Sequence, residues 1–552
     1  MTLGDLPATG KPRIIVVSLD GTTWDLLGPL CREGVMPNLA ALREEGVSGI
    51  LESTIPPVTA PAWITFQTGK NPGKHGFFHF TGPRPGSYEA RVMNAGALQE
   101  RTLWQILGSQ GRRVCAINVP MTYPPCPVNG CMISGLLTPG LSKAFYPPEL
   151  RQELLAAIGD YTIFVPIRQA DFLGPGEFIK KMLGMVQQRM AAARYLMERE
   201  DWDLSMVHVQ ATDIVQHACW ALLDPRHPLY SAGRMEDRLA VQSFYRELDR
   251  LLGDLWDIAR GRATIVVMSD HGFGPAVKRF YLNQWLADQD LLVTRGNLKR
   301  VAHTLETIVR KVDVLKLRRR LLSPRSTVSQ ASQKARGEAL TNWPRTRAYA
   351  VEAPFFGRIY LNVAGRQVQG CVPPGSEYED LRDQIAARLM EVRDPENGQA
   401  LIKRVYKREE IYHGRRLGEM PDLIVQPRPD VMIVTEFRGD HLVEATPSFL
   451  SGTHHRHGIL LMAGPRVRPS GTVERASLVD MAPTLLHLLG LPVPDDMDGT
   501  VLLDALDPAF VAAHPVRYVP AGADPASETA DEYTAEEEET VEDRLEALGY
   551  LE

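Results

Sequence analysis

The sequence has 552 residues, of which 44% are hydrophobic and 23% charged, and its formal net charge is −6. These values are typical of a globular protein large enough for one catalytic domain with an insertion, and the mild acidity argues against a general binder of nucleic acids or anionic membranes. Six cysteines without metal-binding spacing exclude a disulfide framework in so long a chain and are expected to be free thiols.

The amino-terminal residues 1–20 show no basic start and no long apolar core of the kind found in a signal peptide. No uninterrupted apolar run elsewhere approaches the length of a membrane span, which is about 20 residues. We therefore expect a cytoplasmic protein without a transmembrane segment.

The first half of the chain alternates strand-like and helix-like patterns. The predicted elements are, in order, a buried strand ending at Asp20, a helix over residues 36–45, a helix over 60–68 with Pro61 in its first turn, a helix and a strand ending at Asn118, a strand ending near Asp213, a helix over 241–259 and a strand over 263–270. Strands that alternate with helices predict an α/β fold with a doubly wound, mostly parallel sheet flanked by helices.

The pattern changes in the second half. We interpret residues 286–418 as an inserted α+β cap lobe, because they combine a basic stretch (310–325) with short strand-like pieces and a charged helix. The predicted division is a catalytic core over residues 1–285, the cap lobe, a returning core over 419–510 that begins with the strand 421–427, and an acidic tail over 511–552. From residue 524 onward twelve acidic residues accompany one basic residue, Arg544, so we expect a solvated tail with room for a short helix at its end.

One short stretch, VMSDHGFGP, carries a predicted strand straight into an acid and an imidazole. Asp270 and His271 are suitable metal ligands, and they lie just past the carboxyl end of the strand, where open α/β sheets bind their ligands. Asp20 follows another predicted strand in the same way. Taken alone, an acid at this position is more often the N-cap of the next helix.

Further acids and histidines repeat this arrangement. Asp213 and His217 are four residues apart and would share one face of a helix, although such a pair is by itself more often a surface contact. His454 directly precedes an apolar strand. Three neighbouring carboxylates would repel one another and raise one another's pKa unless a cation lay between them. Mixed aspartate and histidine ligation suits two zinc-like ions, and such a pair stabilises phosphoryl displacement.

Thr59 is a candidate nucleophile. It comes immediately before the predicted helix that contains Pro61, and the amino terminus of a helix attracts an anionic phosphate. A threonine hydroxyl is a poor nucleophile at neutral pH, but metal coordination activates it. The alternative is that Thr59 only caps the helix.

The motifs SLDG, TxPxW at Thr59, TDIVQH, SDHG and GTHHRHG occur in that order and resemble those of the alkaline phosphatase superfamily. The chain is most similar to the type I phosphodiesterase and nucleotide pyrophosphatase group with its bacterial phosphohydrolase and phosphomutase relatives, over residues 13–499. The resemblance implies an alkaline phosphatase-like fold and two divalent ions, zinc or alternatively manganese. The ligands that it implies are Asp20, Thr59, Asp270 and His271 for one ion, and Asp213, His217 and His454 for the other.

The sequence departs from this group at one position. The nucleotide pyrophosphatases carry an asparagine that helps to hold the phosphate three residues after the threonine, where this chain has Ala62. Another donor must replace it, and Asn118, Lys70 and Lys74 are candidates. Trp63 stands where the formylglycine sulfatases carry arginine, which argues against sulfatase chemistry; Trp63 and Ala62 favour a diester over a monoester substrate.

The histidine-rich motif leaves the choice of ligand open among His454, His455 and His457. The family spacing, four residues before a glycine, favours His454. His75 and His79, in KHGFFHF, are interpreted as structural or rim residues.

The function that these features favour is hydrolysis of a small-molecule phosphoester by a phosphodiesterase or nucleotide pyrophosphatase-like enzyme, through a phospho-threonine intermediate. A phosphomonoesterase or phosphomutase using the same site is the alternative. A non-catalytic binding protein that uses the basic stretch 310–325 is an alternative of another class, and the acidic tail could regulate access to that stretch. Nucleic-acid binding is not expected, and the oligomeric state is left open.

Overall fold

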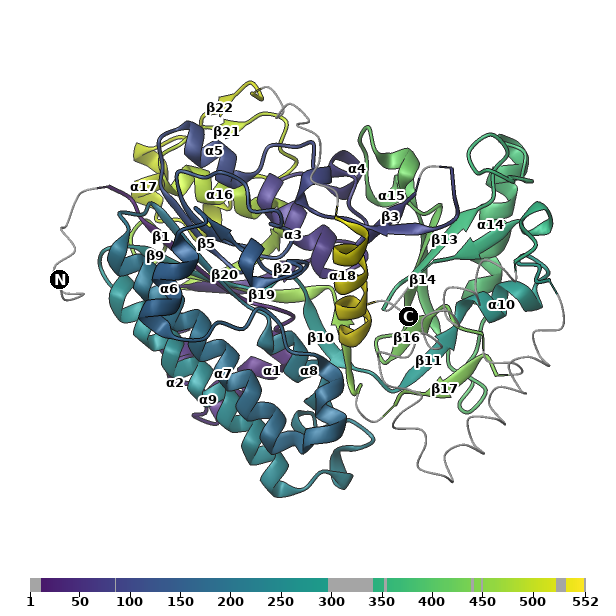
Figure 1. Ribbon diagram of the computed structural model, residues 1–552, viewed down its shortest axis with the longest axis horizontal. Coiled ribbons are helices and arrows are strands. Elements are labelled where there is room, and N and C mark those ends of the chain that lie inside the picture. The colour runs from purple at the N-terminus through teal and green to yellow at the C-terminus, as the bar shows by residue number, and fades with distance from the viewer. Residues whose placement is uncertain are drawn as a thin grey trace.

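The structure is a computed structural model and describes residues 11–84, 86–295, 341–351, 355–437, 441–447, 450–522 and 533–550. The basic stretch 310–325 lies outside the described residues. Figure 1 shows a large α/β domain, a smaller lobe beside it, and the helix α18 (Ala535–Leu548) at their junction.

A mixed sheet of nine strands forms the centre of the large domain, in the order β20-β2-β19-β9-β1-β8-β5-β6-β7. The central strands β9, β1, β8, β5 and β6 run parallel, whereas β19 pairs antiparallel with both β2 and β9. The strands are β1 (Ile14–Leu19), β2 (Val47–Glu52), β5 (Val114–Ile117), β6 (Gly130–Ile133), β7 (Phe145–Tyr146), β8 (Leu204–Val209), β9 (Thr264–Met268), β19 (His457–Ala463) and β20 (Gly471–Ser477). The predicted fold class, a mostly parallel sheet in an α/β domain, is confirmed.

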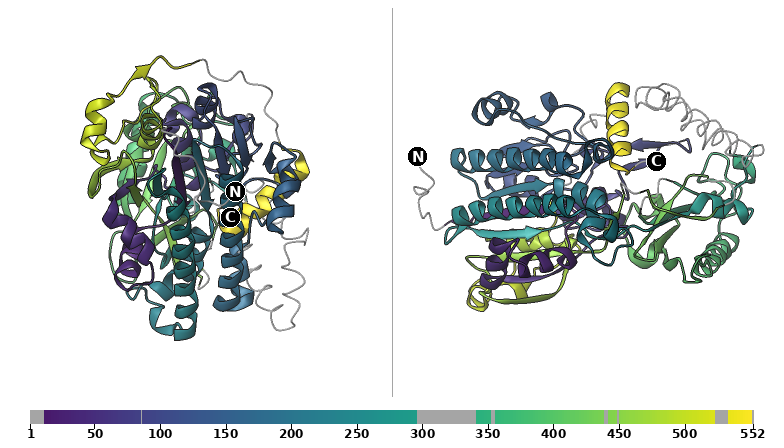
Figure 2. Two further views of the ribbon diagram at one scale, coloured as in Figure 1. Left: turned by 90° about the vertical axis from the view of Figure 1, so that its left-hand side faces the viewer. Right: turned by 90° about the horizontal axis from the view of Figure 1, so that it is seen from below.

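Helices cover the sheet on both faces, as Figures 1 and 2 show. One layer contains α2 (Pro37–Glu45), α7 (Ala170–Arg199) and α9 (Met235–Ala259); the other contains α3 (Thr59–Thr68), α5 (Leu103–Ser109) and α16 (Met481–Leu488). The remaining helices of this domain are α1 (Trp24–Arg32), α4 (Pro72–His75), α6 (Leu150–Ile158), α8 (Ala211–Leu223) and α17 (Pro508–Ala513). Because both faces are covered, central strands such as β1, IIVVSL, are buried along their whole length and show no polar alternation.

The smaller lobe has its own hydrophobic core. Its sheets follow the orders β12-β13-β15-β14 and β16-β11-β17. The lobe contains β11 (Lys278–Tyr281), α10 (Leu282–Asp288), β12 (Ala348–Ala350), β13 (Gly357–Leu361), α14 (Ser376–Met390), β14 (Ile402–Lys407), α15 (Arg408–Ile411), β15 (Leu423–Pro427), β16 (Val431–Val434) and β17 (Val443–Ala445). The assignment of the strand 421–427 to the returning core is therefore wrong, because β15 pairs with β13 and β14.

The carboxyl-terminal segment is also not the solvated tail that its composition suggested. Val541, Leu545 and Leu548 lie on one face of α18 and are buried in the core of the large domain together with Tyr550. Their spacing is that of an amphipathic helix, so the acidic side chains face outward while the apolar stripe packs. A charge count averages over both faces and misses this division.

The six cysteines are all free, as expected, and three of them are buried. None of the helices in the described part of the chain combines the length and the apolar composition needed to cross a bilayer.

Candidate metal centre

Three adjacent parallel strands bring the predicted ligands together at their carboxyl ends. Asp20 directly follows β1, Asp270 and His271 follow β9, and the helix after β8 carries Asp213 and His217. The strand order β9-β1-β8 makes these three strand ends neighbours. Such a crevice at the carboxyl ends of the strands is where open α/β sheets bind their ligands.

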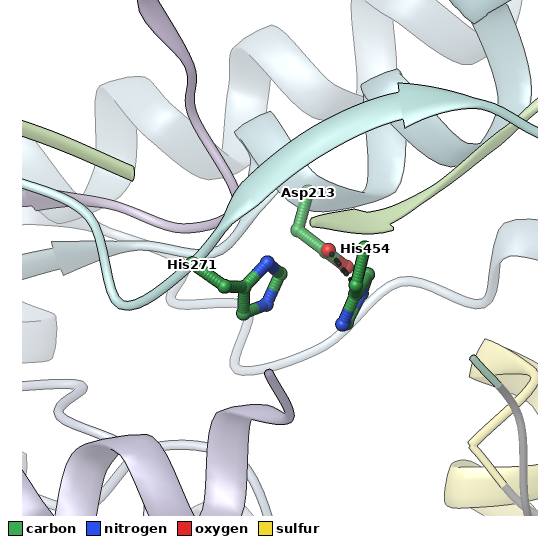
Figure 3. Close-up of side chains that lie close together, drawn as sticks. All are labelled: Asp213, His271 and His454. Carbon is green, nitrogen blue, oxygen red and sulfur yellow. Dashed lines mark hydrogen bonds and ion pairs between the residues drawn. The ribbon is translucent and has the colours of Figure 1, made fainter. Parts of the chain in front are cut away.

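A short antiparallel pair adds the last histidine. The strand β10 (Gly272–Pro275) continues from His271 and pairs with β18 (Gly452–His455), and this register places Phe273 opposite His454. Figure 3 shows the side chains of Asp213, His271 and His454 converging from three different segments of the chain. His454 is buried, His455 is partly buried and His457 is exposed.

Thr59 completes the group, which we call the ligand cluster: Asp20, Thr59, Asp213, His217, Asp270, His271 and His454. Thr59 is the first residue of α3, whose N-cap is Val58 with no side-chain hydrogen bond. Likewise Thr23, not Asp20, caps α1. The alternative that these two residues are only helix caps is therefore wrong.

The first set of side chains surrounds the ring of His271. Its Nε2 lies 3.4 Å from Asp20 Oδ1, 3.5 Å from Asp270 Oδ2 and 3.4 Å from Thr59 Oγ1. Ligand atoms about 2.0–2.1 Å from a tetrahedral zinc ion are roughly 3.3–3.4 Å apart. These side chains are therefore spaced as the ligands of one such ion would be.

The second set is equally tight. Asp213 Oδ1 lies 3.4 Å from His217 Nε2 and 3.1 Å from His454 Nε2, and the two imidazole nitrogens are 3.0 Å apart. Asp213 and His454 also lie close enough to His271 to share an ion with it. The contacts in the two sets thus join His217 to Asp213 and His454, and join His271 to Asp20, Asp270 and Thr59.

Backbone carbonyls fix the orientation of the three histidines. His217 Nδ1 lies 2.9 Å from the carbonyl oxygen of Gly452, and His454 Nδ1 lies 3.0 Å from that of Pro57. His271 Nδ1 lies 3.1 Å from the carbonyl oxygen of Gly272. A carbonyl only accepts, so each Nδ1 must carry a proton, and each Nε2 is turned toward the cluster, the usual arrangement of ligating histidines.

The three carboxyl groups carry a strong electrostatic cost in this dry site. Burial raises the pKa of Asp213 to about 6, and the charge of Asp20 adds to the shift. Burial and the charge of Asp20 likewise raise the pKa of Asp270 well above its usual range. For Asp20, burial acts in the same direction, but His208 and His271 beside it lower the net pKa below its usual range.

The histidines respond in opposite directions. Burial lowers the pKa of His217 to about 4 and that of His454 well below its usual range. Burial also acts to lower the pKa of His271, but the negative charge of Asp270 and Asp20 outweighs it and raises this pKa to about 10. Without a metal, His271 is thus protonated, and its imidazolium ring supplies the positive charge between the carboxylates.

The carboxylate oxygens provide an independent test of whether cations fit. Within the described residues, both oxygens of Asp20 and Oδ2 of Asp270 are buried and accept no hydrogen bond. Imidazole nitrogens of His208 and His271 lie 3.1–3.5 Å from them. Carboxylates buried with so little compensation are costly, and a divalent cation removes that cost. The donor set, its spacing and these unsatisfied oxygens therefore fit two metal ions.

Three residues near the cluster were missed by the sequence analysis. His208, inside β8, lies with Nε2 3.1 Å from Asp20 Oδ2. Phe355, from the lobe, stacks its ring on the imidazole of His454 at a centroid distance of 3.7 Å. Tyr550, from the segment after α18, approaches Asp213 and Thr59. Of these three, only Tyr550 could have been found from the sequence. It directly follows Gly549, and a large residue after a glycine that ends a helix commonly packs back against the protein.

Three aromatic rings close the site on the side of the tail and the lobe. Phe80, Phe355 and Tyr550 are all buried, and we call them the aromatic wall. The ring of Phe80 lies 4.7 Å from that of Tyr550, and the rings of Phe355 and Tyr550 are 6.2 Å apart. Thr59 has an exposed fraction of 0% behind this wall.

The predicted phosphate-binding residues have mixed placements. Lys70 lies past the far end of α3, about 15 Å of helix from Thr59, and forms ion pairs with Glu100 and Asp496. Lys74 pairs with Asp498 at 2.5 Å. These contacts argue against both lysines as phosphate donors, because their ammonium groups are already paired with carboxylates. Although both lysines are close to Thr59 in sequence, the length of α3 separates them from it in space.

Trp63 and Asn118 lie deeper in the domain. Trp63 is fully buried one turn after Thr59 and packs edge-on against His208 at a centroid distance of 5.0 Å. Asn118 follows β5 with a left-handed φ of 57° and accepts a hydrogen bond from the hydroxyl of Tyr161. Within the described residues, neither side chain forms a hydrogen bond with Thr59, whose Oγ1 lies within hydrogen-bond distance of His271 and Tyr550.

His75 and His79 are buried away from the ligand cluster. His75 Nε2 lies 3.0 Å from Thr65 Oγ1, and its Nδ1 accepts from the backbone N–H of Phe77. His79 Nδ1 lies 3.4 Å from Thr81 Oγ1. Their contacts fit the structural role predicted for them.

A model of the family described as type I phosphodiesterase / nucleotide pyrophosphatase matches residues 14–459. Phosphonoacetate hydrolase from Sinorhizobium meliloti, solved in complex with phosphonoformate, has a similar structure, with a TM-score of 0.54 and 18% identity over 87% of this chain and 95% of that one. Murine ectonucleotide pyrophosphatase / phosphodiesterase 5, solved as an inactive variant in complex with AMP, has a TM-score of 0.51 and 15% identity over 90% of this chain and 100% of its own. At these identities the likeness shows a shared fold.

A curated relative matches only a short segment. Over 54 residues the chain is 43% identical to 2,3-bisphosphoglycerate-independent phosphoglycerate mutase from Laribacter hongkongensis. This segment is 10% of the chain and 11% of the mutase, so the chain spans about a tenth of that relative's length.

Proposed function

The chain belongs to the type I phosphodiesterase / nucleotide pyrophosphatase family, whose members are metal-dependent phosphoester hydrolases, and from this premise we propose that it is a phosphodiesterase with Thr59 as its nucleophile. Its substrate is a small-molecule phosphoester. The observation that carries the proposal is the position of the Thr59 hydroxyl, 3.4 Å from His271 Nε2 at the edge of the ligand cluster.

Two divalent ions complete the centre in this proposal. Asp20, Thr59, Asp270 and His271 hold the first, and Asp213, His217 and His454 hold the second. When bound, the ions make the threonine hydroxyl easier to deprotonate and offset the charge that develops on the phosphoryl and leaving oxygens. The second set has two imidazoles and one carboxylate, a composition that suits zinc better than manganese.

The protein itself positions the reacting groups. Thr59 is the first residue of α3, where the positive end of the helix dipole favours a phosphoryl anion. Thr59 Oγ attacks phosphorus in line and releases its hydroxyl proton; the Oγ–P bond forms, and the ester P–O bond breaks with its electron pair on the leaving oxygen, which takes up a proton in place of the one that Thr59 released. Water hydrolyses the phospho-threonine in a second displacement, which restores the hydroxyl.

The surroundings of the nucleophile favour a diester. Ala62 and Trp63, within one helical turn of Thr59, are apolar and fully buried. Among the described residues, the ion-pair partners of Asp20, Asp213 and Asp270 are all histidines. A monoester dianion calls for a charged clamp on its free oxygens, whereas a diester needs less positive charge there.

The test compares bis-p-nitrophenyl phosphate with p-nitrophenyl phosphate on the zinc-loaded protein, using wild type, Thr59→Ala and Thr59→Ser. We expect a higher kcat/KM for the diester, a loss of at least about 1000-fold in Thr59→Ala, and partial retention in Thr59→Ser because it keeps a hydroxyl. Equal activity of wild type and Thr59→Ala would contradict the nucleophile. A clear preference for the monoester would favour the phosphomonoesterase or phosphomutase alternative, to which the short mutase match also points.

A further inference from the structure

The segment after α18 delivers a phenol into the ligand cluster. Helix α18 ends at Gly549, whose φ of 80° is left-handed, and the backbone N–H of Tyr550 returns to the carbonyl oxygen of Leu545. This glycine-dependent C-cap reverses the chain direction. It turns Tyr550, two positions before Glu552, inward toward the cluster.

The phenol contacts both halves of the cluster. Its Oη donates a hydrogen bond to Asp213 Oδ2 at 3.1 Å and lies 3.4 Å from Thr59 Oγ1. Its side chain has an exposed fraction of 0%. Within the described residues, the polar side-chain atoms within hydrogen-bond distance of Thr59 Oγ1 are His271 Nε2 and this hydroxyl.

The hydroxyl lies at the edge of the space that an incoming phosphoryl group must enter, because it is next to both Thr59 Oγ1 and Asp213. A reacting phosphorus must come within about 3–3.5 Å of the attacking oxygen before the bond forms. The phenol oxygen lies at a similar distance from Thr59 Oγ1, and it also forms a hydrogen bond with Asp213, which belongs to the second ligand set. A tyrosine hydroxyl is protonated at neutral pH and is a hydrogen-bond donor.

None of the donors considered from the sequence, Asn118 included, forms a hydrogen bond with Thr59 in the described residues. Ala62 has no donor in its side chain, and the ammonium groups of Lys70 and Lys74 are held by carboxylates elsewhere. We propose that Tyr550 is a catalytic residue whose hydroxyl donates a hydrogen bond to a phosphoryl oxygen during attack by Thr59. When substrate binds, this hydrogen bond replaces the one that the hydroxyl donates to Asp213. This assignment rests on the proposed function, because it takes Thr59 as the nucleophile.

The anchoring of the tail does not depend on this hydroxyl. Arg544 donates to the carbonyl oxygens of Thr138 and Pro139, and the hydroxyl of Tyr533 donates to the carbonyl oxygen of Leu137 at 2.8 Å. Removing the hydroxyl alone, as in Tyr550→Phe, therefore keeps the packed ring and the docked helix. Tyr533→Phe is the matched control, since it removes a phenol hydroxyl from the same tail outside the cluster.

The experiment measures kcat/KM for the diester and the affinity for orthovanadate, which mimics pentavalent phosphorus, on the zinc-loaded full-length proteins. In Tyr550→Phe we expect kcat/KM to fall about 100-fold, as when one oxyanion-hole donor is removed, and vanadate binding to weaken by at least about 10-fold. Zinc content and melting temperature should match wild type, and Tyr533→Phe should keep full activity and vanadate affinity.

Two results would overturn the assignment. Unchanged activity and vanadate affinity in Tyr550→Phe would leave the phenol a packing residue, and tighter vanadate binding with faster turnover would make it a plug that blocks the site. Vanadate binding is read by calorimetry and needs no turnover, so the role of Tyr550 is decided even if Thr59→Ala contradicts the proposed nucleophile.

Discussion

The ligand cluster and the aromatic wall face the same site but are built in different ways. The ligands come from the ends of three neighbouring strands of one sheet and from short segments that adjoin them. The wall comes from three separate parts of the molecule: Phe80 near β3 (Thr81–Pro83), Phe355 from the lobe and Tyr550 from the tail. Figure 1 shows α18 lying across the junction of the two bodies. The rigid sheet thus supplies the charge, while surrounding segments supply the enclosure.

This difference implies that the two regions fail in different ways when altered. Replacing one ligand weakens metal binding by the whole cluster. Displacing the aromatic wall leaves the ligands in place and changes only how well the site is enclosed. Variants in the cluster should therefore have larger effects on turnover than variants in the tail.

The largest expected effect is that of Asp270→Asn. An amide cannot replace the carboxylate, so we expect loss of metal from the first set and a fall in kcat/KM of at least about 1000-fold.

The metal-free variant should be more stable than metal-free wild type. The pKa of Asp270 is raised in the folded protein, so its carboxyl group stabilises the fold only at low pH, and that contribution is lost as the pH rises.

At pH 8 in the presence of a chelator, the melting temperature of Asp270→Asn should therefore lie roughly 1–3 °C above that of wild type. Asp249→Asn is the control, because Asp249 is also buried but accepts the backbone N–H groups of Asn38 and Leu39 at the start of α2. It should lower the melting temperature and leave the zinc content unchanged. A chelated Asp270→Asn protein less stable than wild type would show that the cluster is not under electrostatic strain.

Much of the ligand cluster could be predicted from the sequence because its signals are local. Each acid or histidine directly follows or precedes an apolar strand, and the carboxyl ends of adjacent parallel strands must meet. The buried strand before Asp20 and the helix that begins at Thr59 were likewise visible as a continuous apolar run and a proline in the first turn.

The remaining features depend on contacts that no local pattern contains. The apolar run of β15 would suit either sheet, and only its pairing with β13 and β14 assigns it to the lobe. Lys70 is close to Thr59 in sequence but is separated from it by the length of α3. Phe355 lies in sequence between β12 and β13 of the lobe but packs in the core of the large domain, so its place in the wall follows from tertiary packing alone.

A second prediction concerns the coupling of metal binding to protons. In the metal-free protein the pKa of His271 is raised to about 10, chiefly because the negative charge of Asp270 and Asp20 overcomes the effect of burial. A metal ligand must lose this proton. At pH 8 we therefore expect zinc binding to the first set to release at least one proton, because the raised pKa values of both His271 and Asp270 favour the protonated forms, and we expect its affinity to rise with pH up to the pKa of His271.

Calorimetry in buffers of different ionisation enthalpy measures this release. The second set offers a contrast within the same protein, because the pKa of His217 is lowered to about 4 and that of Asp213 is raised only to about 6. Both are deprotonated at pH 8, so the ion in that set should bind without releasing a proton from them. Equal proton release from both sets, or none from either, would contradict the assignment of His271 as the proton-carrying ligand.

The smallest effect is expected in the tail. Arg544 donates to the carbonyl oxygens of Thr138 and Pro139 and lies over the ring of Phe164, whereas Lys143 forms an exposed ion pair with Glu537. Arg544→Met keeps the side-chain volume but leaves the two carbonyls without a donor, which costs roughly 1–3 kcal/mol and favours opening of α18. Lys143→Met is the control, because it removes only a surface ion pair worth less than about 1 kcal/mol.

We expect hydrogen exchange in α18 to become faster and kcat/KM to fall about 3–10-fold in Arg544→Met only. The reason is that a tail that opens takes Tyr550 away from Thr59 for part of the time. If faster exchange left turnover untouched, the wall would enclose the site without contributing to its chemistry.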